Sequence, residues 1–316
     1  MIIYFDFSAN KTRFIKQQNE NKSFAVDFLI DKSQKRDFAS IIEQICTQND
    51  EILHNLKTEK NYVVIPDQVV GFDNLEVPTT QSFFSTKNKF FQTKFDLLYN
   101  QHNNMSVFEN LYYKDKNKSI FTFAMTKTEI INQVINSFKK YNVLISGISY
   151  FSNVLGEYLT QKQKNFAKSN CLVVFNKKTV GLFAYSNGIT LGTKLFENSK
   201  NKQILAKKYA KFAQNRHNLT KYLNDDFDLN VAKTKLDKQV ETFETPKFEW
   251  AVDEFKNNFE KSNLNIKFNK VIVLNNSKSE QVEKENYFEI NDFSVEDILL
   301  AYKKSPLYTA KRGFWL

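Results

Sequence analysis

Residues 2–13 read I-I-Y-F-D-F-S-A-N-K-T-R, and residues 172–183 read L-V-V-F-N-K-K-T-V-G-L-F. Each stretch is a short apolar run, then a small or polar turn, then a second run beginning with Thr or Val. This is the pattern of a β-hairpin. Two such hairpins, about half a chain apart, predict two related lobes that face each other across a cleft.

The hairpin turns lack the residues that a phosphate site needs. The chain has 7 glycines among 316 residues, and none precedes Gly71. Phosphate-binding loops use glycine because the backbone must approach the ligand without a Cβ in the way. No GxGxxG, GxxxxGK[ST] or Gly-Gly sequence occurs. We therefore expect hairpins that keep the geometry of a nucleotide fold without most of its ligand contacts.

The composition is that of a globular chain, with 41% hydrophobic residues. No run of 18 apolar residues occurs, so no transmembrane helix is predicted. The N-terminus lacks the basic region of a signal peptide and reads as a strand.

The net charge of +10 comes almost entirely from lysine, since only 4 of the 45 basic residues are arginine. Sequence-reading nucleic-acid sites favour arginine for its planar, bidentate fork. The lysine excess, together with abundant Asn, Phe, Ile and Tyr, is typical of an AT-rich coding sequence. We expect no nucleic-acid partner.

The cysteines and histidines form no cluster. Cys46 and Cys171 lie in apolar-periodic segments, which predicts buried free thiols in a reducing compartment. His54, His102 and His217 are scattered along the chain. Metal ligation needs clusters with defined spacing, so no metal site is predicted.

The first 65 residues read as three strands, a helix and a fourth strand. Apolar residues recur at three- and four-residue steps through 33–56, which predicts one amphipathic helix. Asparagine-containing joints separate the first three strands, as expected for turns. The expected strands are 2–8, 11–18, 23–30 and 62–65.

Residues 66–142 read as a small α+β module. Thr126, with Glu129 three residues later, predicts the capped start of a helix. The chain on either side reads as one continuous sheet domain, so we interpret the module as an insertion. Its other expected elements are a strand-like stretch at 68–72, a helix at 82–100 and strands at 107–113 and 119–125.

The remaining chain completes two lobes. Ser294, with Asp297 three residues later, predicts the capped start of the last helix. Other expected elements are strands at 143–149 and 271–274, helices at 153–162 and 202–223, a helix after Pro246, and a third hairpin strand after Gly188. The predicted division is a first lobe of 1–65 and 143–168 and a second lobe of 169–316, with a helical subdomain at about 198–265.

This order of elements resembles the actin-like superfamily and, within it, the branch that contains PilM and FtsA. The turn D-F-S-A-N-K-T-R at 6–13 is similar to the family's D-x-G-x-x-x-x-K turn. Strands ending in proline at 63–66 and 75–78, then helix, hairpin and helix, resemble the inserted subdomain of PilM-like chains. Ser-Asn-Gly at 186–188 lies at the tip of the second hairpin. The resemblance implies an α/β, ribonuclease H-like, duplicated two-lobe fold with a small α+β insertion.

The chain departs from this family at each nucleotide contact. Asp6 survives in the first turn, but Ser8 stands in place of glycine. In the second hairpin Asn176 falls opposite Ser8, or opposite the acid if the alignment slides by two, so no acid is present. The family's Gly-Gly strand end appears as 274–276, Leu-Asn-Asn. The vestigial nucleotide turns would comprise Asp6, Ser8, Asn10, Asn176, Asn275 and Asn276, all of which also suit ordinary turns.

The surviving residues are too few for phosphoryl chemistry. Nucleotide hydrolysis in such folds needs acids to hold Mg²⁺ and backbone amides to hold phosphate. One acid of that set remains. We therefore predict no catalytic residue, no metal and no ATP cofactor, and we do not expect an enzyme.

The resemblance implies a cytoplasmic scaffold of a type IV pilus or related secretion machine. PilM-like proteins bind the cytoplasmic N-terminal peptide of a membrane-anchored partner in a groove beside the inserted subdomain, and they assemble into a ring. By resemblance, this groove would involve the inserted module, residues about 66–142, and the first lobe. The protein would then associate with the inner face of the membrane through its partner.

Two other functions remain open at this point. One is an ATP-using enzyme with displaced acids, for which Asp6, Asp67 and Asp73 are the candidate carboxylates. The other is a division protein similar to FtsA that polymerises on the membrane. In that case the tail at 311–316, which combines two cations with Phe, Trp and Leu, could touch the membrane interface.

Overall fold

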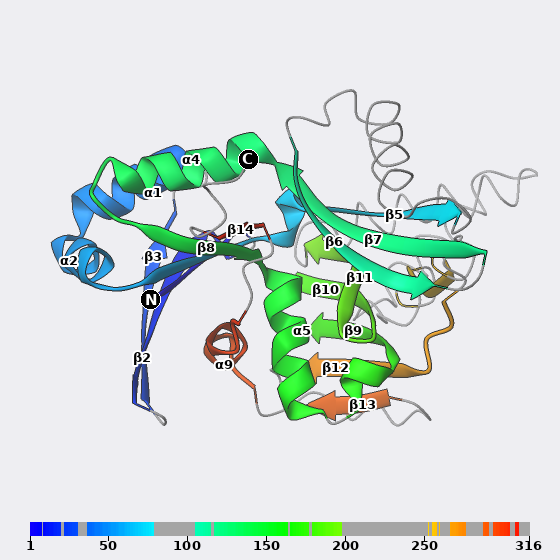
Figure 1. Ribbon diagram of the computed structural model, residues 1–316. Coiled ribbons are helices and arrows are strands. Elements are labelled where there is room, and N and C mark those ends of the chain that lie inside the picture. The colour runs from blue at the N-terminus through cyan, green and yellow to red at the C-terminus, as the bar shows by residue number, and fades with distance from the viewer. Residues whose placement is uncertain are drawn as a thin grey trace, which may run out of the picture.

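Three β-sheets organise the chain in the computed structural model (Figure 1). The structure describes residues 1–7, 9–19, 22–30, 37–78, 105–114, 117–163, 165–176, 179–197, 252, 255–257, 259, 266–275, 287–290, 293–303 and 307–309.

The first sheet has six strands in the order β14-β8-β4-β1-β2-β3. Strands β1, β2 and β3 form an antiparallel meander, while β1, β4 and β8 run parallel to one another. The strands are β1 (Ile2–Asp6), β2 (Lys11–Asn19), β3 (Lys22–Leu29), β4 (Asn61–Ile65), β8 (Ile145–Tyr150) and β14 (Tyr308–Thr309). We call this sheet and its helices the first lobe.

The second sheet repeats this topology in the order β11-β10-β9-β12-β13. Strands β9, β10 and β11 form an antiparallel meander, and β9, β12 and β13 run parallel. The strands are β9 (Asn170–Asn176), β10 (Thr179–Ser186), β11 (Ile189–Glu197), β12 (Lys270–Asn275) and β13 (Tyr287–Ile290). The prediction of two related hairpins is therefore confirmed. We call this sheet the second lobe.

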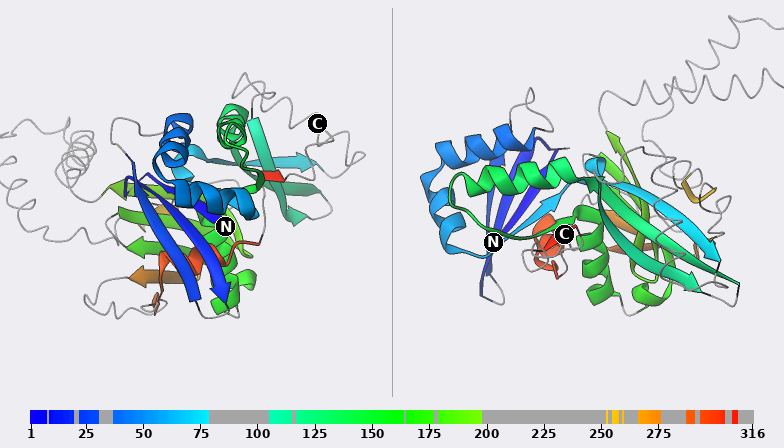
Figure 2. Two further views of the ribbon diagram at one scale, coloured as in Figure 1. Left: turned by 90° about the vertical axis from the view of Figure 1, so that its left-hand side faces the viewer. Right: turned by 45° about the horizontal axis from the view of Figure 1, so that its top comes forward.

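The third sheet is the inserted one, with three antiparallel strands in the order β5-β7-β6. Its strands are β5 (Gly71–Pro78), β6 (Met105–Lys114) and β7 (Lys118–Lys127). Figures 1 and 2 show this inserted sheet beside the second lobe, where β5 and β7 contact β11. The short η2 turn (Asp67–Val69) connects β4 to β5.

Helices cover both faces of the first sheet. Helices α1 (Phe38–Gln48), α2 (Asp50–Thr58) and α4 (Thr128–Lys139) cover one face (Figure 1). Helices α5 (Phe151–Lys162) and α9 (Val295–Leu300) lie on the other face, between the first and second lobes. The short η4 turn (Phe166–Lys168) follows α5.

The single helix predicted over 33–56 is wrong, because α1 and α2 meet at Asn49. Asn49 has an extended backbone, with φ −141° and ψ 91°. Its side chain accepts the N–H of Ile52 at 2.9 Å, so it serves as the N-cap of α2. The apolar spacing continues across this break because both helices pack on the same core.

One predicted cap is wrong and one is confirmed. Helix α4 begins after Lys127, which makes no side-chain cap. The Thr126 hydroxyl instead donates to the carbonyl of Val69 at 2.7 Å, because Thr126 still belongs to β7. At α9, Ser294 and Asp297 form the predicted capping box.

The described residues form three buried clusters. The first joins α1, α2 and α4 to the first sheet, and the second joins α5 and α9 to both large sheets. The third includes Ile120 of the inserted sheet together with Leu172, Leu182 and Phe255. The inserted sheet therefore shares apolar contacts with the second lobe. Cys46 and Cys171 are buried and free, as predicted.

The predicted division of the chain needs one change. Strand β14 pairs with β8 of the first sheet, although the division assigned residues 169–316 to the second lobe. We propose that the other predicted boundaries of the two lobes and of the insertion hold. The expected helices at 82–100 and 202–223, most of the helical subdomain at 198–265 and the tail at 311–316 lie outside the described residues.

Candidate functional site

The first predicted nucleotide turn joins β1 to β2. Asp6 ends β1, and its carboxylate accepts the N–H of Ala9 at 3.0 Å. Asn10 adopts a left-handed backbone with φ 52°, which asparagine tolerates well. Asp6 thus stabilises a tight turn, as its alternative interpretation predicted. Ser8 lies outside the described residues.

The second predicted turn lies at the carboxyl ends of β9 and β12. Asn176 and Asn275 end these two strands and lie directly opposite each other in parallel register. The structure thus brings the backbones of these two residues together, while Asp6 and Asn10 lie together on the other lobe. Asn276 lies outside the described residues.

Aromatic side chains fill the region between these turns. Tyr4, two residues before Asp6, stacks on Phe151 with ring centroids 5.2 Å apart. Phe151 also contacts Phe175, which directly precedes Asn176, at 5.7 Å, and Phe175 contacts Phe293 at 5.5 Å. All four rings are buried. These rings offer no hydrogen-bond donor to a phosphate except the Tyr4 hydroxyl, so they support a packed junction between the lobes.

Arg13 lies at this junction, where it pairs with one acid of the first sheet and one acid of α9. Its Nε and Nη2 donate to Asp27 at 2.6 and 2.8 Å, and its Nη1 donates to Glu296 of α9. The hydrogen bond from Arg13 is the main reason that the pKa of Asp27 falls to about 2. Two carboxylates therefore offset the charge that a phosphate would need. Sequence reasoning missed this set because Glu296 is 283 residues away.

A buried polar network lies at the same junction. The Asp67 carboxylate accepts the N–H of Ser152 at 3.1–3.2 Å and its hydroxyl at 2.7 Å. The Tyr185 hydroxyl donates to the Ser152 carbonyl at 2.6 Å. Burial raises the pKa of Asp67 to about 7, although both hydrogen bonds from Ser152 act to lower it. Sequence reasoning named Asp67 as a candidate catalytic acid, but the structure makes it the cap of α5.

Among the hollows of the described surface, two lie beside the elements discussed above. The larger, which we call the inter-sheet groove, has a volume of about 490 Å³ and lies between β5 and β11. Its walls include Val70, Phe72, Leu191, Thr193, Phe255 and Phe259. At Gly192 a Cβ would lie 2.8 Å from the tip of the Phe259 ring, so any larger residue would require this ring to shift. Asp73, the remaining candidate acid, lines the same groove.

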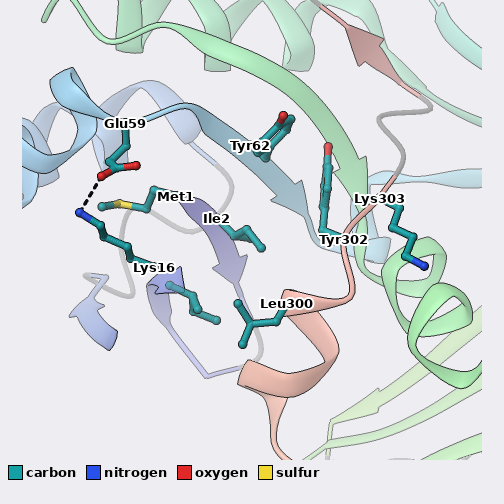
Figure 3. Close-up of a pocket in the computed structure, with 9 residues that line it drawn as sticks. Met1, Ile2, Lys16, Glu59, Tyr62, Leu300, Tyr302 and Lys303 are labelled. Atoms are coloured by element: carbon teal, nitrogen blue, oxygen red, sulfur yellow. Dashed lines mark ion pairs between the residues drawn. The ribbon is translucent and has the colours of Figure 1, made fainter. Parts of the chain in front are cut away.

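The smaller hollow, of about 300 Å³, lies between the start of β1 and the end of α9 (Figure 3). Ile2 and Leu300 line it, the Lys16–Glu59 ion pair at 2.6 Å bounds one side, and Tyr302 bounds the other. Within the described part of the chain no cluster of His, Cys, Asp and Glu could hold a metal ion.

Comparison with known proteins gives a structural likeness and no sequence relative. No known family profile matches the sequence, and no curated protein matches it. A chain of the PilM–PilN type IV pilus biogenesis complex superposes with a TM-score of 0.54, over 86% of this chain and 80% of that chain, at 10% identity. The chain has an actin-like fold.

Two further structures superpose less well. One is the cytoplasmic domain of EpsL, an inner membrane component of the type II secretion system of Vibrio cholerae, with a TM-score of 0.45, 8% identity and 98% of each chain covered. The other is a protein of actin-like ATPase fold and unknown function from Bacteroides thetaiotaomicron, with a TM-score of 0.38, 12% identity, and 68% and 76% of the chains covered.

A nucleotide titration tests whether the packed aromatic junction between the lobes excludes a nucleotide. We expect no saturable heat when Mg-ATP or ADP is titrated calorimetrically into the protein, because packed aromatic rings and a neutralised Arg13 stand beside the vestigial turns. An actin-like ATPase measured in the same buffer is the positive control. Binding in the micromolar range would overturn this prediction.

Proposed function

We propose that this protein is a non-catalytic adaptor of a type IV pilus or related secretion machine. The observation that carries the proposal is the fold shared with a chain of the PilM–PilN complex. The aromatic junction between the lobes supports a rigid scaffold, since a nucleotide-driven protein needs an open, polar cleft between its lobes. The offset charge of Arg13 supports the same conclusion.

The proposed partner is a membrane-anchored protein, bound through its cytoplasmic N-terminal peptide. Peptide recognition of this kind needs an apolar groove and no catalytic residue. The resemblance favoured a groove involving the inserted module and the first lobe. The inter-sheet groove lies instead between the inserted sheet and the second lobe, and we propose it as the binding site. Its volume is in the usual range for ligand sites, roughly 300–1,000 Å³.

The proposed location is the cytoplasmic face of the inner membrane, reached through the partner, with the adaptor assembled into a homo-oligomeric ring. None of the described helices has the length and hydrophobicity of a membrane-spanning helix. The C-terminal tail, on which an FtsA-like membrane contact would depend, lies outside the described residues.

Crosslinking in the native host tests the partner. We expect the tagged protein to capture a single-pass membrane protein with a short cytoplasmic N-terminus, identified by mass spectrometry of the solubilised membrane fraction. A labelled synthetic peptide of that N-terminus should then bind the purified protein in a fluorescence anisotropy titration. Failure to capture any membrane protein would reject the adaptor function.

Variants of the groove locate the peptide. Thr193→Arg narrows one wall and Phe72→Glu places a charge on the other, so each is expected to weaken peptide binding at least tenfold. Leu144→Glu is the matched control, because Leu144 is 76% exposed and lies outside the groove. Thermal melts establish that each variant is folded. If the groove variants bind like the control, the peptide occupies another surface.

A further inference from the structure

The Asp67–Ser152–Tyr185 network connects all three sheets. Asp67 lies in the η2 turn between β4 and β5, Ser152 lies in the first turn of α5, and Tyr185 belongs to β10. Gly156, one turn along α5, lets the Tyr185 ring approach closely, because a Cβ there would lie 2.9 Å from the ring. The three residues therefore hold the first, second and inserted sheets in one arrangement.

The network continues into both walls of the inter-sheet groove. Val70, a groove residue, follows Asp67 by three positions, and the Val70 N–H donates to the Asp67 carbonyl at 3.1 Å. On the other side Thr190 makes side-chain hydrogen bonds with Tyr150 and Tyr185, and it directly precedes Leu191 of the groove. Displacement of Asp67 from Ser152 would therefore move the two walls relative to each other.

Within the part of the chain that the structure describes, no cation acts on the pKa of Asp67. The titratable groups that interact with it are Tyr4 of β1, Tyr150 at the end of β8 and Tyr185 of β10, and Glu157 of α5 acts in turn on Tyr150. Burial raises the pKa of each of these tyrosines, so all three are neutral at physiological pH. Within the described residues only the two donors of Ser152 favour the ionised carboxylate.

We propose that Asp67 is a proton-sensitive latch that holds the inserted sheet against the second lobe and opens the inter-sheet groove when it ionises. A neutral carboxyl is stable in this buried place. An ionised one is costly in a low-dielectric interior without a cation, and water entering between η2 and α5 lowers that cost. The latch itself does not depend on the proposed function. Only the role of the groove as a peptide-binding site rests on that proposal.

Hydrogen exchange of the unliganded protein tests the latch directly. Exchange rates of peptides covering 67–78, 150–156 and 186–194 are measured by mass spectrometry from pH 5 to 8.5 and corrected for intrinsic exchange. Burial sets the native pKa of Asp67 at about 7. The opening constant should therefore rise by up to about tenfold per pH unit below pH 7 and level off above it.

Three variants separate the latch from a general loosening. Asp67→Asn cannot ionise, so its protection should not change with pH. Ser152→Ala removes one donor that lowers the pKa of Asp67, so the response should move to higher pH. Asp73→Asn changes another acid on the groove wall and should respond like the wild type.

The outcomes distinguish the two proposals. A pH response that survives in Asp67→Asn would overturn the latch, as would protection of 67–78, 150–156 and 186–194 that equals the protection of α1 at every pH, since these segments would then open only by global unfolding. Because no partner is present in the exchange experiment, such a result leaves the adaptor function standing. Conversely, a failed search for a membrane partner leaves the latch standing as a property of the fold.

Discussion

Phe151→Ala is expected to lower the free energy of unfolding by about 3–5 kcal/mol, the usual cost of truncating a buried aromatic side chain. Phe151 is 6% exposed and belongs to the cluster that joins both lobes. It stacks on Tyr4 of the first sheet and contacts Phe175 and Phe183 of the second. Its loss leaves a cavity that neither lobe can close alone. Urea unfolding monitored by circular dichroism measures the effect.

Two control variants show whether the loss of stability comes from the buried Phe151 ring. Leu144→Ala truncates a side chain that is 76% exposed, and it should change the free energy of unfolding by less than about 0.5 kcal/mol. Phe151→Leu keeps most of the apolar volume and should cost clearly less than Phe151→Ala. A cost below about 1 kcal/mol for Phe151→Ala would mean that the lobes do not share a packed junction.

Asp67 is expected to make the whole protein less stable as pH rises from about 4 to about 7. Burial raises its native pKa to about 7 from an ordinary value of 3.8. Between these values the unfolded chain has lost the proton and the native state still holds it, so the free energy of unfolding falls as pH rises. The total loss is on the order of 4 kcal/mol, at about 1.4 kcal/mol per pH unit. Above pH 7 the contribution is constant.

Asp67→Asn should remove this slope when urea unfolding is compared at pH 5 and pH 8. Asp27→Asn is the matched acid-to-amide control. The pKa of Asp27 is lowered to about 2, so its stabilisation is lost only as pH falls toward 2. The control should therefore be less stable than the wild type at both pH values yet keep the slope. An unchanged slope in Asp67→Asn would assign the pH dependence to other groups.

The hairpins were predictable because their information is local. Short apolar runs around Asn10 and around 176–179 read as strand, turn and strand, and the structure has β1–β2 and β9–β10 there. The capping box of Ser294 and Asp297 was predictable for the same reason, since its partners are three residues apart. Local patterns were insufficient at Asn49, where one side chain ends one helix and begins the next.

The candidate site was less predictable because its contacts are long-range. Sequence reasoning found Asp6 and the three asparagines as remnants of nucleotide turns. It could not find that Arg13 pairs with Glu296, or that Asp67 caps a helix 85 residues away. It also could not find that β11 and β5 enclose a groove, since no local pattern reports which strands of two sheets become neighbours.

The sequence by itself determined the two-lobed fold and showed that the glycines and acids that bind phosphate are missing. Both conclusions were possible because strand periodicity and turn chemistry depend on residues close together in the chain. Only the tertiary structure decided what replaced the nucleotide contacts: a junction of packed aromatic rings, an arginine neutralised by Asp27 of β3 and Glu296 of α9, and a buried aspartate at the meeting point of three sheets. Packing and burial depend on residues far apart in the chain, and they set both the pKa of Asp67 and the shape of the groove beside it.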